Sequence, residues 1–304
     1  MKKTIFSLPI PALFIIAAAC LWAVDGVIRR SLFSLLPLVI VFYEHLIGSM
    51  LLLPLAMKQL IKERLDRNSL ILILIVSIWS GLLGTLWFTT ALSKVQFIPF
   101  SVVFLLQKLQ PLFATTAAVL ILKEKIQRNY LVWAILAFAA AYFVTFPTGL
   151  VNLQTGAGTI EAALYALGAA FCWGTATVFS KLLLKKHAVI VVTALRFVIT
   201  TLCAALVLLA LGSFDATLSV TSSQLLRFVA IALSTGMVAL YLYYKGLAHT
   251  EAKIATILEL SFPFLAILID GFVYKSFLSW TQLLASGTLI FAIYKTSLLT
   301  QKNT

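Results

Sequence analysis

Residues 102–126 read VVFLLQKLQPLFATTAAVLILKEKI. The segment is long and apolar enough to cross a bilayer, which takes about 20 mostly apolar residues. Two glutamines, a lysine and a proline nevertheless interrupt its middle, within residues 107–111. An ionisable side chain inside a membrane span costs about 2.5–3.5 kcal/mol or more and marks a functional position by default. The segment therefore predicts a membrane helix that is broken where it faces a water-filled cavity.

The rest of the chain has the composition of a membrane protein. Of its 304 residues, 62% are hydrophobic and 11% are charged, and the mean hydropathy is +1.07. Soluble domains are near half apolar and a quarter charged. Apolar windows leave no stretch for a soluble domain and predict ten membrane spans, an all-α fold, at about 11–29, 37–57, 69–91, 98–122, 129–146, 161–181, 188–211, 224–245, 252–273 and 279–298.

The net charge of +13 indicates topology rather than nucleic-acid binding. The two long loops, 147–159 and 212–223, contain no Lys or Arg. By the positive-inside rule we expect a multi-pass protein of the cell (inner) membrane with both termini in the cytoplasm and lipids as partners. Arg29 and Arg30 run against the rule, since they fall in an outside loop. The cations that carry the signal are Lys2, Lys3, Lys58, Lys62, Arg64, Arg67, Lys123, Lys125, Arg128, Lys185 and Lys186.

The N-terminal segment and the cysteines are read as parts of membrane helices. A basic start and an apolar core before Cys20 are typical of a lipoprotein signal. We expect no cleavage there, because the segment around Trp22 has a counterpart in the second half of the chain. Cys20, Cys172 and Cys203 fall inside predicted spans, so we expect buried free thiols rather than disulfides.

The two halves of the chain match each other in several places and in the same order. AAACLWAVDGVIRR (17–30) matches GAAFCWGTATVFSK (168–181), and FTTAL (88–92) matches YYKGL (243–247). LQKLQPLFA (106–114) matches LELSFPFLA (258–266). These alignments place Trp22 with Trp173, Gln107 with Glu259, and Pro111 with Pro263.

Each repeat contains five predicted spans, an odd number, so the two repeats must cross the membrane in opposite orientations. We expect a first repeat over residues 1–150 (helices 1–5) and a second over 151–304 (helices 6–10). Inverted repeats are a recurring architecture of secondary transporters, whose solute site lies near the midplane between the repeats.

These motifs, together with LQPLFATTAAVLILKEKIQRNYLVWAILAFAAAYFV (109–144), resemble the EamA-type transporters of the drug/metabolite transporter superfamily. The resemblance covers essentially the full chain. It implies a ten-helix bundle that moves amino acids, metabolites, cofactors or drugs by alternating access. It also implies a central cavity enclosed by helices 1, 3, 4, 6, 8 and 9. The chain departs from the pattern at two places in the second repeat. Ser276 occupies the position that Glu124 has in the first repeat, and Arg196 lies in the segment that aligns with Glu44 and His45.

Lys108 and Glu259 are the ionisable residues that we expect deepest in the membrane, about 15 and 11 Å from the helix starts at 1.5 Å per residue. Our hypothesis is that Glu259 neutralises Lys108 in the empty carrier. An anionic solute then competes with Glu259 for Lys108, and the released Glu259 takes up a proton. The alternative is a structural ion pair that holds the repeats together.

The remaining site predictions involve aromatic, amide and proline residues. Asp25 and Arg29 are expected to form a local ion pair, and Arg196 is expected to be paired rather than to bind solute. Glu44 and His45 are predicted to join Glu259 in proton coupling. Pro111 and Pro263 are predicted hinges, although either proline could simply kink its helix. The further predicted solute contacts are Trp22, Gln107, Gln110, Trp173, Tyr241 and Tyr244. The alternative is that these side chains only pack between helices or form hydrogen bonds between them.

The sequence therefore predicts a secondary transporter for a small polar or amphipathic metabolite, with an amino-acid-like solute as the first expectation. The alternative is a membrane protein that kept the fold and lost transport. Catalysis is not expected, because the chain has no HExxH, Walker or GxSxG motif. We expect no catalytic residues, metal, cofactor or nucleic-acid partner, and a monomer is among the possible states.

The predicted topology can be tested with reporter fusions. A reporter fused after Thr304 should be active in the cytoplasm, and reporters inserted within 150–156 should be active outside. A periplasmic C-terminus would require an odd number of spans and would contradict the inverted repeats.

Overall fold

The computed structural model describes residues 9–94, 106–151, 158–262, 264–265, 268 and 279–301. This part of the chain is helical and contains no strand. Its elements are α1 (Ile10–Arg30), α2 (Pro37–Leu60), α3 (Arg67–Val76), η1 (Ser77–Gly84), α4 (Thr85–Lys94), α6 (Gln110–Leu122), α7 (Arg128–Thr145), α8 (Thr159–Leu184), α9 (Val189–Ala210), η2 (Phe214–Ser219), α10 (Ser222–Leu233), α11 (Met237–Leu247), α12 (Ala252–Leu258) and α14 (Trp280–Gln301).

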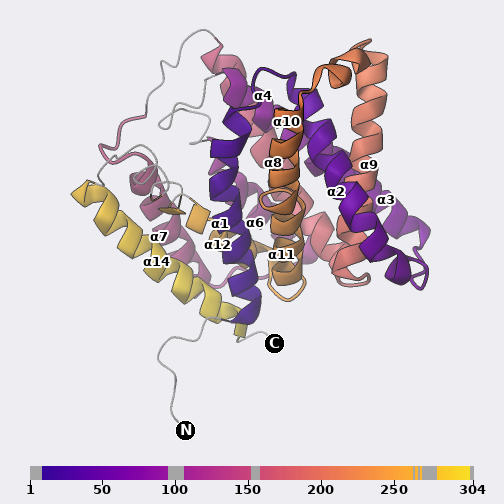
Figure 1. Ribbon diagram of the computed structural model, residues 1–304. Coiled ribbons are helices and arrows are strands. Elements are labelled where there is room, and N and C mark those ends of the chain that lie inside the picture. Colours follow the sequence, from indigo (N-terminus) through magenta and orange to yellow (C-terminus); the bar gives the residue numbers. More distant parts are fainter. Residues whose placement is uncertain are drawn as a thin grey trace.

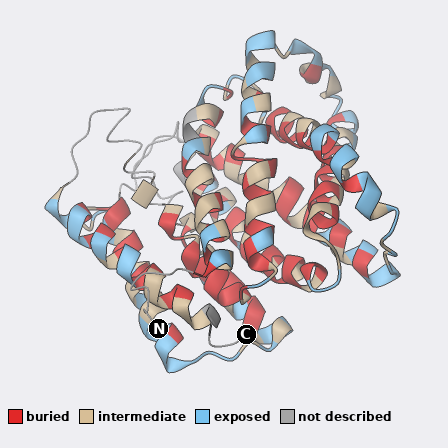
Figure 2. Cartoon of the chain, turned by 60° about the horizontal axis from the view of Figure 1, so that its bottom comes forward, coloured by how far each residue is buried: buried red, intermediate tan, exposed pale blue. Residues whose placement is uncertain are grey.

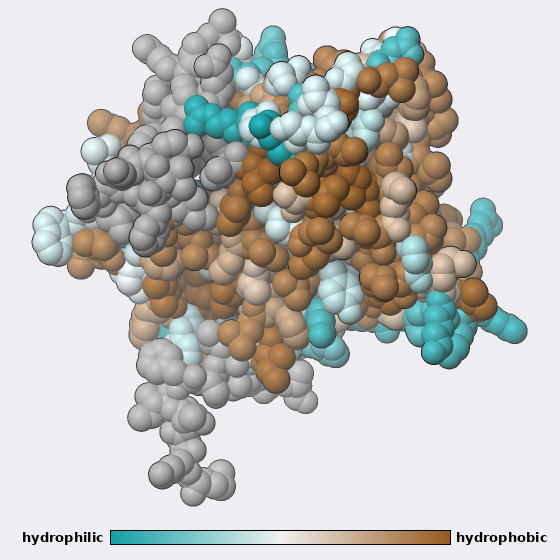
Figure 3. Space-filling model, in the orientation of Figure 1, coloured by the Kyte–Doolittle hydropathy of each residue, from teal (hydrophilic) through white to brown (hydrophobic). Residues whose placement is uncertain are grey.

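Eight helical stretches of the described chain are long and apolar enough to cross a membrane. They coincide with eight of the predicted windows, and the shorter apolar helix α6 lies in a ninth, 98–122. This window and 252–273 extend outside the described residues, so the count of ten stays a prediction. Apolar residues cover the middle of the face seen in Figure 3, and hydrophilic residues gather near its upper and lower ends.

The helices form one bundle whose buried residues face one another in its interior (Figure 2). The first turn of α1 and the last turn of α14 lie at the same end of the bundle (Figure 1). α2 begins at the opposite end, where α1 finishes (Figure 1). α9 follows α8 and begins at the same end of the bundle as α1 (Figure 1). The helices α2 and α9 therefore enter the bundle from opposite sides.

The packing of the helices repeats itself between the two halves of the chain. α2 packs on α9, and α7 packs on α14 at one side of the bundle (Figure 1). α1 packs on α11, and its counterpart α8 packs on η1 and α4. α6 packs on α12. Exchanging the two halves converts each of these pairs into itself or into another of them, as a pseudo-two-fold axis requires.

The third and eighth spans are irregular at equivalent positions. η1 is a π-helical segment of eight residues. Between α10 and α11 the chain turns at Ser234–Gly236, where Gly236 N–H donates to the Ile231 carbonyl at 2.7 Å and Ala239 N–H to the Ser234 carbonyl at 3.1 Å. The match of FTTAL with YYKGL aligns Ser80 in η1 with Thr235 in this turn. Segments of this kind widen the helix and recur at functional sites.

The fourth and ninth spans are also interrupted at equivalent positions. A turn at Lys108–Leu109 precedes α6, and a turn at Glu259–Leu260 follows α12. Leu109 N–H donates to the Leu106 carbonyl, and Leu260 N–H donates to the Ile257 carbonyl, each three residues back. The predicted break in 107–111 is thus confirmed. Pro111 is buried in the first turn of α6, where it needs no N–H partner. Pro263 lies outside the described residues.

The short helix α12 is anchored at its first turn by the α6–α7 connection. The Glu124 carboxylate accepts hydrogen bonds from the backbone N–H groups of Ala252, at 2.8 Å, and Lys253, at 3.2 Å. The Tyr130 hydroxyl donates to the Lys253 carbonyl at 3.2 Å. The Glu124 contacts cap the N-terminal N–H groups of α12, and together with the Tyr130 contact they fix the position of Glu259 at its other end.

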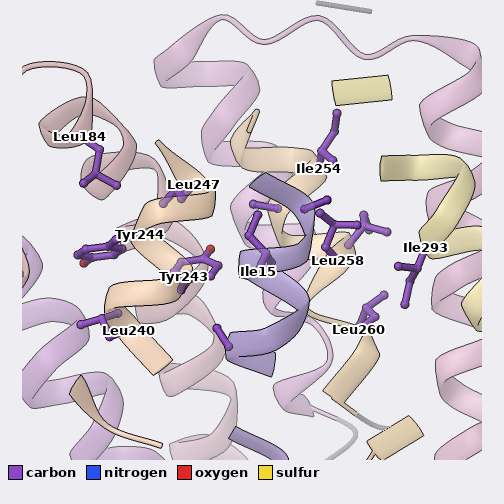
Figure 4. Close-up of a cluster of buried hydrophobic side chains, with 14 of the residues drawn as sticks. Ile15, Leu184, Leu240, Tyr243, Tyr244, Leu247, Ile254, Leu258, Leu260 and Ile293 are labelled. Carbon is purple, nitrogen blue, oxygen red and sulfur yellow. The ribbon is translucent and has the colours of Figure 1, made fainter. Parts of the chain in front are cut away.

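The main hydrophobic cluster joins α11 and α12 to α1 (Figure 4). Within it, α1 and α11 approach closely because Gly246 has no side chain. A Cβ atom at Gly246 would lie 2.5 Å from the Pro11 carbonyl oxygen and 2.6 Å from the Ile15 side chain. Small residues allow membrane helices to pack at such short separations.

We predict that Gly246→Ala lowers stability by about 1–3 kcal/mol, because the added methyl group overpacks a rigid backbone contact. Gly287 is the matched control, since an added Cβ there meets no atom within 4 Å. Gly287→Ala should be neutral or stabilising by up to about 1 kcal/mol, from helix propensity alone. Thermal unfolding of the purified variants in detergent measures both. Equal effects of the two changes would contradict the close α1–α11 contact.

Candidate functional site

Glu259 and Gln110 meet at the two helix interruptions. Gln110 Nε2 donates to Glu259 Oε2 at 2.9 Å. The Tyr243 hydroxyl lies near the same carboxyl group. Within the described part of the chain the second carboxyl oxygen, Glu259 Oε1, is buried and has no hydrogen-bond partner. A buried acceptor without a partner is costly, and such an atom calls for an explanation.

Lys108 lies at the other interruption and does not pair with Glu259. Its side chain is buried, with 9% of the residue exposed. Among the described residues no carboxylate oxygen lies within 4.0 Å of its ammonium group. The alternative of a structural Lys108–Glu259 ion pair is therefore not supported. Gln107 is half-buried beside Lys108.

The two predicted tryptophans occupy equivalent surroundings. Trp22 of α1 packs on Tyr243 of α11 with ring centroids 5.4 Å apart, and Trp173 of α8 packs on Phe88 of α4 at 5.1 Å. Trp173 also donates from Nε1 to the Ser80 carbonyl at 3.1 Å. The alignment of FTTAL with YYKGL makes Phe88 the counterpart of Tyr243. The two aromatic pairs are therefore related by the pseudo-symmetry.

Tyr243 was not among the predicted site residues, whereas Tyr241 and Tyr244 were. Tyr244 is 1% exposed, and Tyr241 is half-buried. Tyr243 and Tyr244 project to different sides of α11 (Figure 4). Tyr243 therefore reaches Glu259 and Trp22, and Tyr244 reaches a separate polar network around Arg196. The solute-binding roles of Tyr241 and Tyr244 stay predictions.

The first polar network surrounds Arg29, which is 4% exposed. Its guanidinium group binds the Asp25 carboxylate through Nε at 2.6 Å and the Glu44 carboxylate through Nη2 at 2.9 Å. Nη1 donates to the Thr89 hydroxyl at 3.4 Å, and the Thr235 hydroxyl donates to Asp25 at 2.6 Å. The predicted Asp25–Arg29 pair is confirmed. Because Arg29 is buried and paired, it is not a loop charge that opposes the positive-inside pattern.

The second polar network surrounds Arg196, which is 8% exposed. Nη1 donates to the Tyr244 hydroxyl at 2.7 Å, and Nη2 donates to the Ser80 hydroxyl at 2.8 Å. The Tyr244 hydroxyl lies 2.9 Å from Ser180 Oγ. Within the described chain, Arg196 is thus paired with hydroxyl groups: no carboxylate oxygen lies within 4.0 Å of its guanidinium group, and its buried Nε–H has no acceptor.

The two networks use the same positions of the two repeats. Glu44 and Arg196 both lie seven residues after the first residue of their helices, about 10 Å along α2 and α9. Since these helices start at opposite ends, the networks lie in opposite halves of the bundle. The equivalent positions are Arg29 and Ser180, Glu44 and Arg196, Thr89 and Tyr244, and Thr235 and Ser80.

His45 does not join the first network through its Nδ1 atom. This atom lies 2.9 Å from the Val41 carbonyl, so it carries the hydrogen, and the ring packs on Phe197 with centroids 4.8 Å apart. The roles of Glu44 and His45 in proton coupling stay predictions.

A sequence model of the EamA-like transporter family matches residues 9–146 and, a second time, residues 160–298. The chain belongs to the EamA-like transporter family. It is a transporter rather than an enzyme, and a multi-pass membrane protein, as the sequence predicted.

Two similar proteins extend this result. The riboflavin transporter ImpX of Fusobacterium nucleatum is 38% identical over 289 residues, which cover 94% of this chain and 97% of ImpX. A crystal structure with 17% sequence identity covers 96% of this chain and 98% of its own, with a TM-score of 0.75. At that identity the second match shows the fold alone.

The Arg29 network makes a testable contribution to stability. Arg29→Met leaves the buried Glu44 carboxylate and the part-buried Asp25 carboxylate without their cation, which should lower stability by about 3–5 kcal/mol. Arg64→Met, at an exposed position, is the matched control and should change stability by less than about 0.5 kcal/mol. Denaturation of both variants in detergent measures the difference. An unfolding curve for Arg29→Met like that of the wild type would contradict a paired, buried Arg29.

Proposed function

We propose that the protein is a secondary carrier that moves riboflavin across the cell membrane by alternating access. The observation that carries the proposal is the 38% identity to a riboflavin transporter over nearly the full length of both chains. This relationship favours a flavin over the amino-acid-like solute that was the first expectation from sequence. Riboflavin is amphipathic: a planar tricyclic ring carries a polyol chain.

The residues around the helix interruptions suit such a solute. Trp22 is half-buried and packs on Tyr243, so an aromatic face lies beside the Glu259–Gln110 pair. Stacking on an aromatic side chain contributes about 1–3 kcal/mol for a nucleobase, and a flavin ring is larger. Riboflavin has no carboxylate or phosphate that could bind Lys108. We therefore assign Lys108 and Gln107 to hydrogen bonds with the hydroxyl groups of the polyol chain.

The pseudo-symmetry of the two polar networks supports alternating access. Networks in opposite halves of the bundle can alternately close the path to the solute, since each joins helices from both repeats. Arg29 contacts Glu44 and Thr89 of the first repeat, and Asp25 joins it to Thr235 of the second. We assign Pro111 and Pro263 as the hinges of this movement.

We also propose that both termini lie in the cytoplasm.

We assign proton coupling to Glu259. Its Oε1 has no partner within the described chain, whereas Glu44 is engaged by Arg29. When Glu259 Oε1 carries a proton, it can no longer accept a hydrogen bond from the solute as the ionised oxygen does. The proton and the solute would therefore bind to Glu259 one after the other. In this proposal Glu259→Gln removes the pH dependence of transport.

Riboflavin binding can be measured by flavin fluorescence, which stacking on an aromatic ring quenches. Purified wild-type protein should bind riboflavin saturably, and Trp22→Ala should weaken binding about tenfold or more. Trp22→Phe keeps an aromatic face and should retain most of the affinity.

Trp133 provides the matched control, because it packs on Phe291 at the α7–α14 side of the bundle. Trp133→Ala should leave riboflavin binding unchanged. An absence of saturable binding by the folded wild type would contradict the proposed solute. Equal losses in Trp22→Ala and Trp133→Ala would contradict the proposed position of the site.

A further inference from the structure

We propose that Glu259 and Gln110 select the solute by binding the imide edge of the flavin ring, with Glu259 Oε1 accepting the N3–H hydrogen. The inference rests on the proposed function and adds a specific recognition contact to it. The pyrimidine ring of riboflavin presents a carbonyl, the N3–H group and a second carbonyl along one edge. No bond is made or broken, and no proton is transferred in this contact.

The first support is the unequal use of the two carboxyl oxygens. Glu259 Oε2 accepts the Gln110 amide hydrogen at 2.9 Å, and Oε1 is buried without a partner in the described part of the chain. A carboxylate can only accept hydrogen bonds, so the missing partner must be a donor. A buried acceptor of this kind is costly when empty and favours a ligand that supplies an N–H or O–H group.

The second support is the donor beside it. The Gln110 amide nitrogen has two hydrogens, of which one is directed at Glu259. The second hydrogen has no acceptor among the described residues, so it can donate to a carbonyl oxygen next to the ligand N–H. Acceptor and donor therefore stand side by side, which is the pattern complementary to N3–H and a neighbouring carbonyl.

The third support is the aromatic plane at the same place. The Tyr243 hydroxyl lies near the Glu259 carboxyl group, and the Tyr243 ring packs on Trp22. A planar heterocycle that stacks on this pair can bring its polar edge to Glu259. An aliphatic amino acid or a sugar has neither the flat ring nor the adjacent imide donor.

Glu259 and Gln110 also come from opposite repeats, at the ends of α12 and α6. A solute edge that bridges them connects the two halves of the bundle at their equivalent interruptions. This contact changes whenever the repeats move relative to each other, so binding and conformational change are linked at this point.

The test compares riboflavin with 3-methylriboflavin, in which a methyl group replaces the N3–H donor, on the purified full-length protein. Wild type should bind the methylated flavin about tenfold or more weakly, as expected for the loss of one charge-assisted hydrogen bond. Glu259→Met removes the acceptor, so it should weaken riboflavin binding similarly and bind both flavins within about threefold of each other. Glu259→Gln keeps an acceptor and should fall between the two.

Glu161→Gln is the control, because this glutamate is exposed and pairs with Lys94. It should retain both the affinity and the methyl penalty of the wild type. Uridine carries the same edge without the tricyclic ring, and it should compete at least about a hundredfold more weakly than riboflavin, through the lost stacking.

The outcomes separate this inference from the proposed function. If wild type binds riboflavin and 3-methylriboflavin equally, or if the methyl penalty persists in Glu259→Met, the recognition contact is wrong and the flavin carrier stands. If neither flavin binds to folded wild type, both are wrong. A melting temperature for Glu259→Met at or above that of the wild type confirms that a loss of binding is not a loss of folding.

Discussion

In the hydrocarbon of a bilayer, every buried polar group has to find its partner inside the protein. This constraint determines where the chain is irregular. The third, fourth, eighth and ninth spans each depart from a regular helix, and the departures occur at equivalent positions of the two repeats. The same positions hold the buried polar side chains, so the breaks and the polar residues form one arrangement that occurs twice.

The two copies differ in charge, and the difference is informative. In the first repeat Arg29 is compensated by Asp25 and Glu44. In the second, Arg196 bonds only to neutral hydroxyl groups among the described residues and keeps an N–H that has no acceptor there. Glu259 keeps an oxygen that has no donor in the described part of the chain. A protein selected for stability alone would avoid such atoms, whereas a carrier needs polar groups that its solute can satisfy.

Much of the fold could be predicted from the sequence, because composition, loop charge and internal matches report on the bilayer directly. The break at Lys108 was predictable from one lysine and one proline in an apolar run. The directions of side chains were not. Tyr241 and Tyr244 lie three residues apart within α11, but this spacing does not show which side of the helix meets the end of α12, and Tyr243 is the tyrosine near Glu259.

Partners distant in sequence were also beyond prediction. The i, i+4 spacing indicated the Asp25–Arg29 pair, yet the contact of Arg29 with Glu44 depends on how α1 and α2 pack. Similarly, equal depth suggested that Lys108 and Glu259 could pair. The turns at 108–109 and 259–260 determine the directions of these side chains. The depth of a residue in the membrane, estimated from its position in the sequence, does not predict such turns.

The central claim is that a flavin binds between two repeats that alternately expose it to the two sides of the membrane. Entrance counterflow tests it most directly: proteoliposomes loaded with unlabelled riboflavin are diluted into a trace of labelled riboflavin. A transient accumulation of label above equilibrium is expected, because a carrier exchanges one solute molecule for another. Uptake that rises only to equilibrium, whatever the riboflavin inside, would contradict it.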